Sequence, residues 1–155
     1  MQTVTDYLTD RTSGLPDPDT RPEFYADTVA KRGLAWGVDL LLIAGLVLLT
    51  VPLTLFVSLF FLPVVWLAVS FVYRWWGLAT FSATPGMRLF AIELRDRAGE
   101  RLDAVTGFLH VGGYFVSMAV FPMQLVSIAL MFLSSRKQGL TDHVLGTAAI
   151  NRAAT

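Results

Sequence analysis

Residues 31–40 read KRGLAWGVDL, and they open the hydrophobic run that decides the fold. From Leu40 to Tyr73 the sequence contains no Asp, Glu, Lys, Arg or His, which makes this region apolar enough to cross a bilayer. Asp39 is then an ionisable group inside the hydrocarbon or at its boundary, a costly position. In a helix, Arg32 and Asp39 lie within about 20° of one face and roughly 10 Å apart along the axis. They share a face without touching, so we expect another part of the chain to complete the site.

Composition also indicates a membrane protein. The 155 residues are 54% apolar and 15% charged, with a mean hydropathy of +0.58, whereas about a quarter of an ordinary soluble chain is charged. The formal net charge is zero, so no global field favours a nucleic-acid partner. Cysteine is absent, which excludes disulfides and thiolate metal sites. We expect a protein surrounded by the lipid bilayer, without nucleic acid, cofactor or metal.

The uncharged blocks predict an all-α membrane protein with two transmembrane helices, over about residues 33–50 and 55–77. One helix over both blocks would be about 60 Å long, twice the hydrocarbon thickness, so the chain must turn near Pro52. Pro63 lies inside the second predicted helix and should kink it.

A third hydrophobic segment covers about residues 106–134 and is interrupted by Pro122. It is longer than one span needs and shorter than two full spans. We predict that it is kinked or re-entrant at Pro122, shielded by the first two helices, with a tilted single span as the alternative.

Two polar regions flank or separate these segments. Residues 1–29 are acidic and interrupted by proline, which predicts a disordered tail before a membrane domain over residues 30–152. Apolar and polar residues alternate after the turn signal at Pro85, which predicts a small cytoplasmic β-hairpin over about residues 88–105. Its exposed edge should pair with residues 146–152, which are small or favour strands.

Basic residues predict the orientation. They precede the first span at Lys31, gather between the second and third segments at 88–101, and follow the third at Arg136. The positive-inside rule places all three groups in the cytoplasm, with the N-terminus on that side of a bacterial inner membrane.

Small residues form a second face on the first helix. Gly33, Gly37 and Ala44 lie about 130° around the helix from the charged face. We expect this face to pack against the second helix, with a dimer contact as the alternative.

Three motifs together resemble the RDD family of small membrane proteins, which is named for one arginine and two aspartates. They are an arginine entering the first helix with an aspartate seven residues later, a T-P-G-x-R turn at 84–88, and a terminal G-L-x-D-x-x-x-G-T at 139–147. The resemblance covers about residues 25–152, and Arg32, Asp39 and Asp142 match the name-giving positions. It implies transport of an unknown ligand, with sodium/proton exchange proposed for some members. The chain departs from the family pattern at Met87, usually lysine, and at His110, usually arginine.

We therefore expect Arg32, Asp39 and Asp142 to form one buried site that transports a small cation or proton. A monomer of 17.1 kDa has little interior for a path, so a homo-oligomer is expected. The alternative is a scaffold or assembly factor in which the same residues form a fixed ion network. The secondary candidates are His110, His143 and Arg88. The sequence lacks the usual nucleophile, zinc and phosphate-loop motifs, so we do not expect an enzyme.

Overall fold

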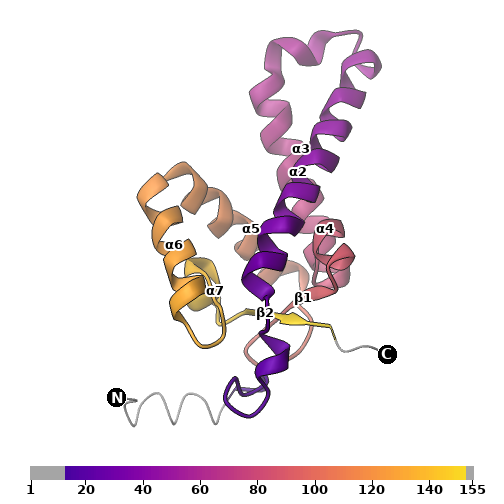
Figure 1. Cartoon of the computed structure of the whole chain (residues 1–155). Helices are drawn as coiled ribbons and strands as arrows, with labels where there is room; N and C mark the ends of the chain where they lie inside the picture. Colours follow the sequence, from indigo (N-terminus) through magenta and orange to yellow (C-terminus); the bar gives the residue numbers. More distant parts are fainter. Residues whose placement is uncertain (1–12, 153–155) are drawn as a thin grey trace.

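The computed structural model describes residues 13–152. Helices α2 (Thr28–Leu53) and α3 (Leu62–Phe81) form a hairpin that projects away from the rest of the molecule (Figure 1). Both are long and apolar enough to cross a membrane, as predicted. The other described elements are η1 (Pro22–Phe24), η2 (Val57–Phe61), α4 (Pro85–Leu89), β1 (Ile92–Arg95), α5 (Ala104–Ala119), α6 (Phe121–Leu133), α7 (Leu140–Leu145) and β2 (Ala148–Asn151).

The hairpin turns later than expected, and Pro63 does not kink a helix. Pro52 lies in the last turn of α2, and the chain reverses at Leu55 and Phe56, which both have positive φ. The 3-10 helix η2 follows, and α3 begins at Leu62 with Pro63 in its first turn. A proline there interrupts no helical hydrogen bond, because the first N–H groups of a helix have no partner within it. The kink predicted at Pro63 is therefore wrong.

The third hydrophobic segment is bent. Helices α5 and α6 are inclined at 118° across a break at Val120, and Pro122 lies in the first turn of α6. The predicted kinked or re-entrant element is thereby confirmed. Phe108 of α5 packs edge-on against Phe71 and Trp75 of α3, which fixes the bent pair beside the hairpin.

A two-stranded antiparallel sheet joins distant parts of the chain. Strand β1 pairs with β2 in a register that matches Ile92 with Asn151 and Arg95 with Ala148. This confirms the predicted pairing of residues 88–95 with 146–152. The hairpin expected over 88–105 is shorter, because its return segment makes a single bridge, between Arg95 and Arg101.

Capping residues explain the shorter hairpin. The Thr84 hydroxyl accepts a hydrogen bond from the Met87 N–H, which starts the short helix α4 where the sequence predicts the first residues of a strand. Asp103 caps α5 in the same way through the Thr106 N–H, so residues 104 and 105 are helical. Helix capping thus defines both ends of this region.

Part of the expected disordered tail is folded. The sequence predicts disorder over residues 1–29, but Leu15 and Tyr25 are buried against the apolar residues of β2, and α2 begins at Thr28. Residues 1–12 of the predicted tail lie outside the described residues. Because β2 also pairs with β1, the N-terminal segment, the loop after α3 and the C-terminal strand all lie at one end of the hairpin.

Two residues of the small-residue face of α2, Gly33 and Gly37, do not pack against α3. A Cβ built at Gly33 or Gly37 would meet no other atom within 4 Å. The buried stripe of α2 instead repeats every four residues and includes the carboxylate: Ala35, Asp39, Ile43 and Val47. The helix therefore packs through its charged face, because that face holds the polar group that must be taken out of the lipid.

Candidate functional site

Asp39 is the centre of the first buried polar cluster. It is 1% exposed and is surrounded by donors from α3 and from the turn into α4. Its Oδ1 accepts hydrogen bonds from the Tyr73 hydroxyl at 2.7 Å and from the Gly86 N–H at 2.8 Å. Its Oδ2 accepts one from the Thr84 hydroxyl at 2.5 Å. Three short hydrogen bonds thus satisfy this carboxylate without Arg32.

The sequence of the turn explains this arrangement. Thr84 caps α4, and Pro85 occupies its first turn, which presents the next backbone N–H to Asp39. Gly86 is required by the close approach of α2. A Cβ there would lie 2.3 Å from the Ala35 carbonyl oxygen and 2.7 Å from the Asp39 Oδ1.

Arg74 of α3 completes this cluster with a loose contact. It is 8% exposed, and its Nη1 lies 3.7 Å from the Asp39 Oδ2, which is an ion pair but too long for a hydrogen bond. Its guanidinium carbon lies 4.9 Å from the centre of the Tyr114 ring. The buried Nε has no hydrogen-bond partner among the described residues. Arg74 is therefore a buried cation with guanidinium N–H donors that have no acceptor among the described residues.

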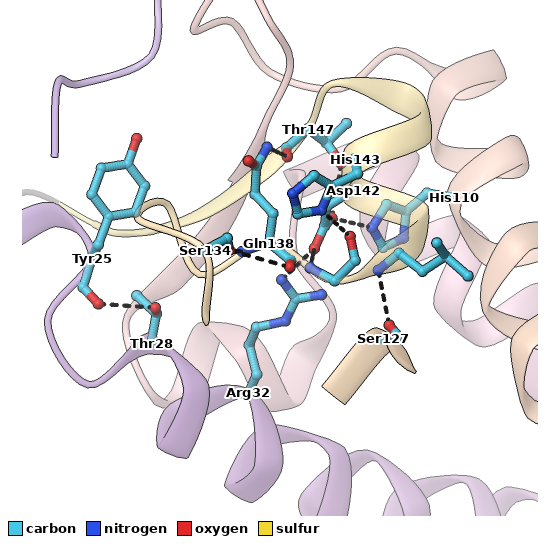
Figure 2. Close-up of polar contacts among 12 residues, drawn as sticks. Tyr25, Thr28, Arg32, His110, Ser127, Ser134, Gln138, Asp142, His143 and Thr147 are labelled. Atoms are coloured by element: carbon cyan, nitrogen blue, oxygen red, sulfur yellow. Dashed lines mark hydrogen bonds and ion pairs between the residues drawn. The ribbon is translucent and has the colours of Figure 1, made fainter. Parts of the chain in front are cut away.

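Asp142 is the centre of the second cluster, shown in Figure 2. It lies in α7 and is fully buried. Its Oδ2 accepts hydrogen bonds from the Arg32 Nη1 at 2.6 Å and from the Gly139 N–H at 3.0 Å. Its Oδ1 contacts the His110 Nε2 at 2.8 Å and accepts from the Thr147 hydroxyl at 2.8 Å. Two of the four partners, Arg32 of α2 and His110 of α5, come from other helices, and the other two flank α7 itself, so Asp142 fixes α7 to both helices.

The surroundings of Asp142 also fix its charge. Burial by itself would raise the pKa of this carboxyl. The Arg32 guanidinium, with His110 and the Gly139 N–H, outweighs burial and holds the pKa well below its usual range. Asp142 is therefore ionised at neutral pH and forms a permanent ion pair with Arg32.

The three residues expected in one site are divided between the two clusters. Arg32 pairs with Asp142, and Asp39 pairs with Arg74. Within residues 13–152, no hydrogen bond or ion pair joins Arg32 to Asp39. The reason is geometric. The two lie about two turns apart on α2, and each meets a different neighbouring element.

The secondary candidates also divide. His110 belongs to the Asp142 cluster. His143 is exposed, and its Nδ1 contacts the Gly139 carbonyl of its own turn. Arg88 is exposed, with its guanidinium 4.3 Å from the centre of the Phe81 ring. Among the described residues, no hydrogen bond or ion pair joins either His143 or Arg88 to Asp39 or Asp142.

Arg74, Tyr73 and Thr84 belong to the Asp39 cluster but were not predicted from the sequence. A signal for Arg74 is present, because it is the only charged residue between Leu40 and Met87. A single arginine in a spanning helix needs a partner, and Asp39 is the only acid in the preceding helix, α2. Thr84 is the first residue of the T-P-G-x-R motif, which identifies the turn but not its contact with Asp39, whereas Tyr73 has no comparable signal.

The two clusters border one cavity of about 570 Å³. Arg32, Asp39, Arg74, His110 and Asp142 all line it, and the remaining wall is mostly apolar. The part of the chain that the structure describes has no group of three or more His, Cys, Asp or Glu side chains suited to a metal ion. The cavity therefore combines a few fixed charges with a hydrophobic lining.

Neither a curated protein nor a solved structure matches the chain. The model of one family, described as the RDD family, matches residues 26–146. That range is most of the chain and includes both clusters apart from Thr147. With two candidate spans, a bent helix pair and the two carboxylate clusters inside the matched range, the chain belongs to the RDD family of membrane proteins.

Proposed function

We propose that this RDD-family protein moves a small ligand across the membrane and that the cavity between α2, α3, α5, α6 and α7 is its binding site. The observation that carries the proposal is that two buried carboxylate clusters border a single cavity in the helical part of the protein. Ionisable groups inside membrane helices are costly and usually mark a substrate or ion path. A volume of about 570 Å³ also suits a small molecule.

The two clusters have different roles in this proposal. Asp39 and Arg74 sit on the two long helices, and Arg74 offers unused donors to the cavity. Asp142 and Arg32 attach the short helix α7 to α2, and every acceptor position of Asp142 has a partner. The Asp39 cluster is thus the ligand-facing part, and the Asp142 cluster holds the cavity together.

Exchange of a cation or proton, the expectation from the buried acids, is one form of such transport. Asp39 would have to release the Tyr73 or Thr84 hydroxyl before its oxygens became available to a cation. Exchange at Asp39 therefore requires α3 or the turn into α4 to move in each cycle. The homo-oligomer that we propose would supply the second wall of the path, since one chain of 17.1 kDa has few helices for it.

A scaffold or assembly factor is the second proposal. It is supported by the complete set of partners around Asp142, which is what a fixed structural contact needs. In this case the cavity is a packing defect rather than a binding site. Both proposals are non-enzymatic.

The orientation that we propose follows from charge. The sheet and the base-rich loop lie at one end of the α2–α3 hairpin, and the reversal at the other end, residues 50–62, has no charged residue. The positive-inside rule then puts the sheet in the cytoplasm, in a bacterial inner membrane.

Flux across reconstituted liposomes tests transport. Sodium, potassium and proton movements are followed with internal dyes, and a permanently charged alkyl sulfonate is followed in parallel. We expect the native protein to carry at least one of these above protein-free vesicles, and Asp39→Asn to remove the flux. The matched control is Asp19→Asn, which changes an exposed acid outside the membrane helices. Absence of any flux from the folded native protein would favour the scaffold.

A further inference from the structure

The cavity has more hydrogen-bond donors than acceptors among its charged groups. Asp39 accepts three hydrogen bonds and faces the Arg74 guanidinium, while Asp142 accepts from Arg32, Gly139 and Thr147 and contacts His110. A carboxylate has room for about four such partners, so Asp142 is saturated, and the one position left on Asp39 is on the Oδ2, which faces Arg74. A cation entering the cavity would meet the positive charge of Arg74 at the one remaining carboxylate position.

The donors of Arg74 remain available. A guanidinium carries five N–H groups, and this one makes no hydrogen bond to any residue in the described range. Burying such a group without partners is costly. Arg74 lines the cavity, so a ligand that enters it can supply the missing acceptors.

Tyr114 holds the guanidinium in place and adds a donor. Its ring covers Arg74 at 4.9 Å, and its hydroxyl accepts a hydrogen bond from the Trp36 Nε1 at 2.8 Å. Its own O–H has no acceptor among the described side chains and backbone. An acceptor near Arg74 can thus receive hydrogen bonds from both residues.

The rest of the wall suits a flexible hydrocarbon. Three of the five methionines of the chain, Met87, Met118 and Met131, line the cavity together with Ile128 and Phe132. Methionine side chains adapt their shape, and they are used where a surface binds apolar groups of variable form. This wall offers few fixed polar contacts, so it selects for an apolar chain rather than for a polar solute.

We propose that the cavity binds an amphipathic anion, with a carboxylate, phosphate or sulfonate head on Arg74 and Tyr114 and a single alkyl chain against the methionine-rich wall. The inference rests on the proposed ligand site, and it names the cargo class of that site. Arginine binds such oxyanion heads through two parallel N–H groups. The anion satisfies the buried guanidinium, and the alkyl chain remains in surroundings as apolar as the lipid.

Equilibrium binding in phosphatidylcholine nanodiscs tests the inference independently of flux. The probe is radiolabelled dodecyl phosphate, measured as saturable binding above that of protein-free nanodiscs, with dodecyltrimethylammonium as a competitor of equal chain length. We expect the native protein to bind the phosphate and the ammonium not to compete. Arg74→Gln should weaken binding roughly tenfold or more, because it removes charge-assisted hydrogen bonds.

Arg88→Gln is the matched control, because Arg88 also lies over an aromatic ring but is outside the cavity lining. It should bind like the native protein. If Arg74→Gln does not fold, Ile128→Trp blocks the cavity without touching a charge, and the same loss is expected. Any of three results would overturn the inference. They are competition by dodecyltrimethylammonium as strong as that by unlabelled dodecyl phosphate, binding by the Arg74 or Ile128 variant as tight as that by the native protein, and no saturable binding at all.

Two further measurements distinguish the source of the anion and separate the proposed ligand class from the proposed transport. Replacing part of the phosphatidylcholine with phosphatidylglycerol displaces the probe if a bilayer phospholipid supplies the anion, and leaves it bound if the anion is a free single-chain amphiphile. Either result fits the cavity chemistry. Arg74-dependent binding without liposome flux would uphold the ligand class and reject transport, whereas cation flux without anion binding would reject the ligand class alone.

Discussion

Replacing Asp142 with Asn probes the second cluster most directly. The carboxylate accepts from or contacts four groups, and an amide retains one oxygen while turning its NH₂ toward two of them. Two hydrogen bonds to a charged group are then lost, at about 1.5–3 kcal/mol each. The typical cost of breaking a buried pair, about 3–5 kcal/mol, already includes these hydrogen bonds and the counter-charge that Arg32 loses. We expect Asp142→Asn to lower the free energy of unfolding by about 3–5 kcal/mol.

A double-mutant cycle shows which residues share a cluster. Unfolding free energies are measured in mixed micelles by titration with dodecyl sulfate, with circular dichroism as the signal. Arg32→Gln combined with Asp142→Asn should show a coupling of at least about 1 kcal/mol, because the two side chains are in direct contact. Arg32→Gln combined with Asp39→Asn should be additive to within about 0.5 kcal/mol. Equal coupling in both cycles would mean that the three residues form one site, and would refute the division into two clusters.

Three other changes give distinct results. Gly86→Ala should destabilise the protein by more than about 2 kcal/mol, because its Cβ would clash with the backbone of α2. Gly112→Ala, in open space, is the control and should be neutral or stabilising. Melting temperatures in detergent measure both, and equal effects would contradict the close approach of α2 to Gly86. The pKa of Asp142 is lowered, so its ion pair stabilises the fold fully above about pH 4, and this contribution is lost as the pH falls further. The melting temperature of the native protein should therefore drop more steeply below about pH 4 than that of Asp142→Asn. Parallel curves for the two proteins would contradict a stabilising ion pair at Asp142. The variants Glu100→Cys and Thr54→Cys should react with an impermeant maleimide from opposite sides of the membrane, because the two positions lie at opposite ends of the α2–α3 hairpin. Glu100→Cys should react from the cytoplasm. Reaction of both variants from the same side would exclude a spanning hairpin.

Hydrophobic patterning was sufficient to predict the two spans, the bent third segment and the pairing of the two strands, but not the short helices α4 and α7. The absence of charge between Leu40 and Tyr73 fixes the two spans, and Pro122 marks the bend because a proline begins a new helix more easily than it continues one. The pairing of β1 with β2 follows from an exposed edge that needs a partner on the same side of the membrane.

Spacing along one helix could not predict which charged residues pair between different elements. The seven-residue interval between Arg32 and Asp39 describes one helix, whereas their partners come from α7 and α3. Three-dimensional packing determines which element meets each turn of α2. The same limit applies to Gly33 and Gly37, because spacing shows that a small face exists but not that another helix approaches it.

The meeting of the two chain ends has a consequence for biosynthesis. Asn151, near the C-terminus, donates to the carbonyl oxygens of Glu23 and Ala26 and accepts a hydrogen bond from Lys31. A ribosome releases residues 23–31 long before it adds Asn151, so these contacts form only after residue 151 has been synthesised. A chain truncated before Asp142 can insert its first hairpin but leaves Arg32 and Lys31 without their partners. Such a truncated chain therefore carries two unpaired cations at the start of α2 that are paired in the folded protein.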